Sequence, residues 1–212
     1  MRLFPRRFRH FLLGLATCLA VVIFCTPSFS YSLPTKSAQA SQFQTLDSDF
    51  SVSAANQTNI QIAKATLLAQ GMNRFTSYVA PMTESNVVGS SPGMTPARGA
   101  VGAVLSGNRL VVRGSFKMLT SDMRDYATDP VNPPNPSITS AFHIHQGTPM
   151  ENGPFQYALD VTLDDTERSG SAMGEYTLTE EQMRALADNR LYVDIHTTEN
   201  RGGELRGTLM PY

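Results

Sequence analysis

Cysteine and histidine are scarce in this chain. It contains two cysteines, Cys18 and Cys25, and four histidines among 212 residues. Its N-terminal apolar run, residues 11–25, falls short of the roughly 20 residues that a transmembrane helix needs. We also find no nucleophile paired with a base, no phosphate-binding loop and no pair of glycosidase carboxylates. Hydrolytic chemistry therefore has no support, and the few histidines become the main candidates for function.

The first 40 residues have the pattern of an export signal. Basic residues precede the apolar run, and a basic segment followed by an apolar one is typical of a signal peptide. Small residues permit cleavage after Ser30 or after Ala40, and we favour Ala40. The alternatives are an uncleaved anchor, a lipid anchor on Cys18 and twin-arginine export through Arg6 and Arg7. We predict a signal peptide over residues 1–40 and a mature protein that is secreted or periplasmic.

Loss of residues 1–40 changes the charge and the redox chemistry of the chain. It removes five of the 17 basic residues and none of the 18 acidic ones, which leaves a formal charge of −6. This balance argues against nucleic acid as a partner, and against the membrane after cleavage. Both cysteines leave with the signal, so the mature chain has no disulfide and its core alone must hold the fold.

The rest of the chain has the pattern of an all-β domain. Residues 41–60 are polar, with few large apolar side chains, and predict a flexible leader. A β-sandwich domain is expected over residues 61–212, because eight short apolar or alternating segments follow, separated by Gly, Asn and Pro. They cover residues 60–70, 97–107, 109–119, 138–146, 155–164, 170–178, 191–197 and 203–210. The Gly107–Asn108 pair predicts a tight hairpin between two of them.

One short helix interrupts the strands, before the penultimate one. Thr179 can cap it while Gln182, three residues on, reaches back in a capping box, and Glu180 and Glu181 suit its positive N-terminus. We expect this helix to pack against one end of the sandwich. Two long loops, residues 81–96 and 120–137, are candidates for function or for mobility.

Every histidine of the mature chain lies in one of two strands. In a strand, residues two apart share a face, so His143 and His145 point one way while Phe142 and Ile144 point the other. The same alternation in residues 191–197 places Asp194 and His196 opposite the apolar side chains. All three imidazoles therefore avoid the core.

Neighbouring strands would bring His143, His145, His196 and Asp194 together. Three neutral imidazoles form a good site for one copper or zinc ion, with the carboxylate as a fourth ligand or as an acceptor for a ring N–H. The alternative is structural, with each imidazole bonded to a loop carbonyl. Glu204 and Arg206 share a strand face, where they either pair with neighbours or stay solvated.

Several motifs resemble the CHRD (chordin-type) domain family. They are AFHIHQG, NGPFQYAL, TLTEEQMRAL, LYVDIHT and ENRGGELRGTL, with weaker likeness upstream, and together they cover residues 62–210. The chain departs from the pattern in a long Pro-rich insertion before Phe142 and in Arg201, where Pro is common. The resemblance implies a secreted β-sandwich module, usually without enzymatic activity.

A more distant likeness is to copper-zinc superoxide dismutase, a Greek-key sandwich. His143, His145 and His196 would correspond to its copper ligands, and Arg206 to an arginine near the metal. No histidine remains for a bridge or a zinc site, and no cysteine for the disulfide. Two function classes therefore stay open: a non-catalytic exported module with an unknown protein or matrix partner, or a small copper-dependent redox protein or copper carrier.

Overall fold

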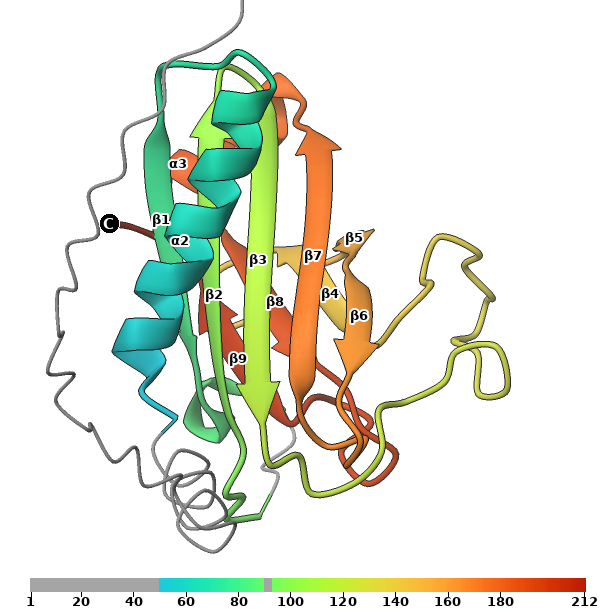
Figure 1. Ribbon diagram of the computed structural model, residues 1–212. Helices are drawn as coiled ribbons and strands as arrows, with labels where there is room; N and C mark the ends of the chain where they lie inside the picture. The colour runs from blue at the N-terminus through green and yellow to red at the C-terminus, as the bar shows by residue number, and fades with distance from the viewer. Residues whose placement is uncertain (1–49, 90–92) are drawn as a thin grey trace, which may run out of the picture. The chain divides into compact units, whose positions relative to one another are not determined.

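The computed structural model describes residues 50–89 and 93–212 (Figure 1). The predicted signal peptide and the first part of the predicted leader lie outside these ranges. All described residues belong to one compact unit, Gln42–Tyr212. No helix among them is both long enough and apolar enough to cross a membrane.

Two antiparallel sheets form the body of this unit, and the predicted all-β sandwich is confirmed. The larger has the order β10-β1-β2-β3-β7-β6, and the smaller has the order β5-β4-β8-β9. The strands are β1 (Thr76–Met82), β2 (Arg98–Ser106), β3 (Arg109–Lys117), β4 (Phe142–Gln146), β5 (Phe155–Ala158), β6 (Asp160–Leu163), β7 (Gly170–Thr177), β8 (Leu191–Ile195), β9 (Leu205–Thr208) and β10 (Met210–Pro211). The Greek-key order of the connections stays a prediction.

The hydrophobic core lies between the two sheets. Phe142, Ile144 and Val193 of the smaller sheet are fully buried against residues of the larger one, such as Phe116. The rings of Phe116 and Phe142 meet edge to face at 6.1 Å between centroids. These are the apolar positions that the strand alternation assigned to the core, and their burial supplies the main force that holds the sheets together.

A long helix, α2 (Val52–Ala69), covers the outer face of the larger sheet (Figure 1). This corrects two predictions: residues 60–70 are not a strand, and residues 52–60 are not a flexible leader. The side chain of Ser51 caps the helix by accepting a hydrogen bond from the Ala54 amide. Ile60, Ala63 and Leu67 recur at helical spacing and pack on β2 and β3, so a buried stripe rather than strand alternation sets the local structure.

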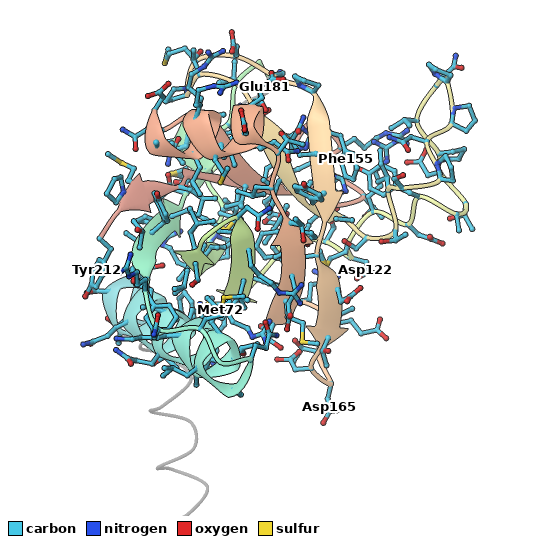
Figure 2. All side chains as sticks on the ribbon, turned by 90° about the horizontal axis from the view of Figure 1, so that it is seen from above. Met72, Asp122, Phe155, Asp165, Glu181 and Tyr212 are labelled. Carbon is cyan, nitrogen blue, oxygen red and sulfur yellow. The ribbon has the colours of Figure 1, made fainter. Side chains whose placement is uncertain are left out.

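The predicted short helix and hairpin are both present. Helix α3 (Glu180–Ala187) begins with the expected capping box between Thr179 and Gln182. It lies on the side of the sandwich away from α2, as Figure 2 shows by the position of Glu181. Gly107 and Asn108 connect β2 and β3 with Ser106 paired to Arg109, and Gly107 takes the positive φ that such a turn requires.

The chain changes sheet within two of the segments predicted as single strands. Residues 155–164 contain β5 of the smaller sheet and β6 of the larger, and residues 203–210 contain β9 and the first residue of β10. An isolated bridge between Thr83 and Arg206 joins the two sheets beside β9, next to the 3₁₀ turn η1 (Glu84–Asn86). This junction lies close to the candidate site.

Candidate metal centre

The outer face of the smaller sheet carries the histidines in a regular pattern. His143 on β4 pairs with Asp194 on β8, which pairs in turn with Arg206 on β9. His145 and His196 lie two residues further along their own segments, on the same face. The hydrogen-bonded register of three strands therefore brings these side chains together, as the sequence predicted.

The four predicted ligands converge on one point. One ligand atom from each of His143, His145, His196 and Asp194 can be chosen so that all lie within 4.8 Å of one another. The Asp194 Oδ1 oxygen lies 3.1 Å from His196 Nε2, 3.2 Å from His145 Nε2 and 4.0 Å from His143 Nδ1. The predicted clustering is confirmed.

The cluster faces away from the core between the sheets, but it is buried. The side chains of His143 and Asp194 are 2% exposed, and those of His145 and His196 are 14% and 12% exposed. The Tyr126 ring lies 5.3 Å from that of His143, between centroids, and Phe155 also lies 5.3 Å from it. The sequence did not single out Tyr126, because it comes from a loop and not from the strands that carry the histidines.

Each imidazole has an inner ring nitrogen, which faces Asp194, and an outer one, which forms a hydrogen bond with a different loop. His143 Nε2 lies 2.6 Å from the Ser140 carbonyl oxygen, His145 Nδ1 lies 3.0 Å from that of Gly153, and His196 Nδ1 lies 2.9 Å from that of Arg201. These carbonyls belong to loops 118–141, 147–154 and 196–204. The alternative interpretation of the sequence, in which each imidazole bonds a loop carbonyl, is therefore confirmed for the outer nitrogens.

The outer contacts determine which nitrogens carry protons. A carbonyl oxygen can only accept, so each outer nitrogen donates, and in a neutral ring the inner nitrogen is then an unprotonated acceptor. Three such nitrogens surround Asp194 Oδ1, which is itself an acceptor. His145 Nε2 is buried and lacks a hydrogen-bond partner within the described part of the chain. The centre of the cluster therefore needs positive charge, from a proton or from a metal ion.

Burial and charge shift the pKa values of the cluster in different directions. Burial and the neighbouring His196 lower the pKa of His143 to about 4. Burial opposes charge at Asp194 and His196, but each stabilises the charged form of the other, so the pKa of Asp194 falls well below its usual value and that of His196 rises. The adjacent carboxylate therefore favours a proton on His196.

Arg206 is buried beside the cluster rather than solvated, with 3% of its surface exposed. Its Nη2 lies 3.4 Å from Asp194 Oδ2 and 2.6 Å from the Asn152 side-chain oxygen, and its guanidinium lies 4.3 Å from the Tyr192 ring centroid. One carboxylate oxygen of Asp194 thus faces the imidazoles and the other faces arginine. Glu204 is also fully buried, where its Oε1 accepts from Thr95 Oγ1 and the Thr120 amide.

The fold and the cluster define a small antiparallel sandwich module with one buried histidine–carboxylate centre. The family model for the CHRD domain matches residues 78–209, more than half of the chain, and the chain belongs to this family. Helix α2 lies outside the matched region. No curated protein and no solved structure gave a match.

Proposed function

We propose that this CHRD protein is an exported, non-catalytic binding or matrix module whose loop-bearing face is held together by one metal ion. The observation that carries the proposal is the convergence of three inner imidazole nitrogens on Asp194 Oδ1, which can accept hydrogen bonds but has no proton to donate to them. Buried polar atoms normally have a partner, and a cation would satisfy all four ligand atoms at once.

The geometry is that of a closed, four-ligand site. Zinc–nitrogen bonds of about 2.0–2.1 Å place tetrahedral ligands about 3.3 Å apart. The distances from Asp194 Oδ1 to the three inner nitrogens, 3.1 to 4.0 Å, bracket this spacing. The four ligand atoms spread over up to 4.8 Å, so the rings would have to draw together on binding. Four protein ligands complete the coordination of a structural zinc ion, whereas catalytic sites keep a position open. Zinc in a structural role is therefore the best fit.

Such an ion would act through the loops. Since His143, His145 and His196 each bond a carbonyl of a different loop, an ion that fixes the three rings would fix loops 118–141, 147–154 and 196–204 together. These hydrogen bonds also orient the rings and favour the required tautomers. A metal-ordered loop face suits a module that binds a protein or matrix partner.

The alternative is a copper-dependent redox protein or copper carrier. Imidazole ligands also suit copper, and copper exceeds zinc in intrinsic affinity for most nitrogen sites. The cover of aromatic side chains over His143 and the burial of Asp194 argue against open access of a substrate to the ion. Export of the protein is inferred from the basic and apolar N-terminal segments of the sequence.

The test compares the thermal stability of metal-free protein with and without added zinc or copper. At a free metal concentration one hundred times the Kd, binding stabilises the native state by about 2.7 kcal/mol. His145→Ala should abolish most of this gain. His145→Asn is sharper, because the amide nitrogen of Asn can still donate to the Gly153 carbonyl while the inner nitrogen is lost.

Asp125→Asn is the matched control. Asp125 is an exposed loop carboxylate that bonds within its own turn, and its replacement should leave the metal response unchanged. The proposal would be contradicted if neither metal changed the melting temperature of the wild-type protein. It would also be contradicted if the His145→Asn variant kept the full metal-induced rise in melting temperature. Elemental analysis of protein from the native exported fraction distinguishes zinc from copper, because overexpression can load the wrong metal.

A further inference from the structure

A pocket of about 680 Å³ lies beside Arg206, the neighbour of the candidate metal centre, where the two sheets meet near β1 and β9. Its walls are mostly apolar and include Val87, Val88, Pro149, Met150 and Met210. Asn152, next to this wall, donates to the Val88 carbonyl and accepts from Arg206, so both sides of the pocket are tied to the site. A pocket of this size with apolar walls and a few polar groups is typical of small-molecule sites.

Two polar residues lining this pocket have buried atoms without a partner. Arg206 Nε and Asn189 Oδ1 are both buried and, within the described residues, neither has a hydrogen-bond partner. One is a donor and the other an acceptor. Both atoms are enclosed by protein, so they mark a polar end of the pocket rather than direct contacts for a ligand. The positive φ of Asn189, 56°, belongs to the end of α3, where its amide donates to the Leu186 carbonyl.

The charge of the pocket selects the ligand. Arg206 is the one charged residue among its described lining residues, and no acidic side chain lines it. Asp194 forms an ion pair with the guanidinium, and a cation bound to the other oxygen of Asp194 would leave the region more positive. An anionic group is therefore favoured and a cationic one is disfavoured.

Exposed apolar side chains at the pocket indicate that the ligand also has an apolar part. Met150 is 83% exposed and Met210 is 51% exposed, although both carry flexible apolar thioethers. Methionine adapts its shape to apolar ligands, and its burial would remove this surface from water.

We propose that this pocket binds a small apolar organic anion. Its apolar body covers Met150 and Met210, and its acidic group is directed toward Arg206. The pocket is formed in the protein without an ion, so the inference goes beyond the proposed function and does not require it.

Anilinonaphthalene sulfonate is a suitable probe, because it is an apolar anion with one N–H donor. Its fluorescence in the presence of native protein, well below the melting temperature, should report saturable binding at one site. Met150→Glu should weaken this binding about tenfold or more, equivalent to about 1.4 kcal/mol, and Met150→Lys should strengthen it. Met150 is an exposed side chain, so neither change threatens folding.

Met173 provides the matched control. It lies on β7, is 52% exposed and is not part of the pocket. Met173→Glu and Met173→Lys should leave probe affinity unchanged. Absence of saturable binding to the native protein, or an equal response to charge at Met150 and Met173, would overturn the proposal. The probe titrations are carried out on both metal-free and metal-loaded protein. A protein that binds the probe but whose stability does not respond to metal would refute the metal proposal and leave the pocket proposal standing.

Discussion

The two sheets of this domain each bury an outer face, and they do so by different means. The larger sheet is covered by α2, where Leu67, Val104 and Val111 form a small apolar cluster. The smaller sheet is covered by loops and buries the ionisable side chains of the cluster around Asp194. An apolar face is stabilised by packing alone, whereas a buried polar face requires that every charge find a partner. Function is therefore expected on the second face.

The largest effect is expected from removing the carboxylate at the centre of the polar face. Asp194→Leu leaves Arg206 buried without its ion-pair partner, and loss of one partner of a buried pair costs about 3–5 kcal/mol. Urea denaturation of metal-free protein measures this loss. The double variant Asp194→Leu/Arg206→Met should recover part of it, since no charge is then left unpaired. A single variant within about 1 kcal/mol of wild type would show that this face tolerates an unpaired charge.

A comparable loss on the apolar face should be independent of metal. Leu67 lies on the inner face of α2 and is fully buried against the larger sheet, so its truncation to Ala should cost about 2–5 kcal/mol through lost burial and a cavity. Leu68→Ala is the neighbouring control, because Leu68 is 53% exposed and its truncation should change stability by less than about 0.5 kcal/mol. Calorimetry with and without zinc would sharpen the comparison. A Leu67→Ala variant with an altered metal-induced shift would mean that the two faces are coupled.

Acid should destabilise the metal-free polar face through His143. Its pKa in the folded protein is about 4, against an ordinary value of 6.5, so the unfolded chain takes up the proton first. The contribution of His143 to the free energy of unfolding is therefore most favourable above pH 6.5 and falls by roughly 3 kcal/mol as the pH drops from 6.5 toward 4. His196 has the opposite sign, since its raised pKa adds stability that is lost as the pH rises through that value.

His143→Gln removes the titrating group while its amide can still donate to the Ser140 carbonyl. Its unfolding free energy should vary less than that of the wild type between pH 6.5 and 4. The difference between the two denaturation profiles isolates His143 from carboxylates that titrate in both proteins. Identical slopes in this window would contradict the assignment.

The smallest effect is expected at the cap of α2. The side chain of Ser51 accepts from the Ala54 amide at 3.3 Å, and Ser51→Ala should cost about 1 kcal/mol. Ser51→Gly should cost only a few tenths, because glycine is itself tolerated at a helix N-cap. Thermal denaturation of the three proteins measures the order. If the Ser51→Ala variant is as stable as the wild type, the first turn of α2 contributes little to the stability of the face that this helix covers.

The candidate site was more predictable than the N-terminal part of the fold. A period of two in residues 142–146 and 191–196 placed three histidines and Asp194 on one face, and antiparallel pairing of β4 with β8 then brought them together. Residues 60–70 were misassigned because Ile60 and Ile62 alternate like a strand. The spacing of Ile60, Ala63 and Leu67 was the better guide, since tertiary packing rewards a stripe at helical period.

The sequence by itself determined which side chains share a face, because the two-residue period of a strand is a local property of the backbone. It also determined the cap of α3 and the turn at Gly107, which depend on residues within a few positions of each other. Only the tertiary structure decided that the polar face is buried, which loop carbonyl each imidazole holds, and that Arg206 turns inward to Asp194. These depend on loops distant in sequence, whose closure over the sheet no local pattern records.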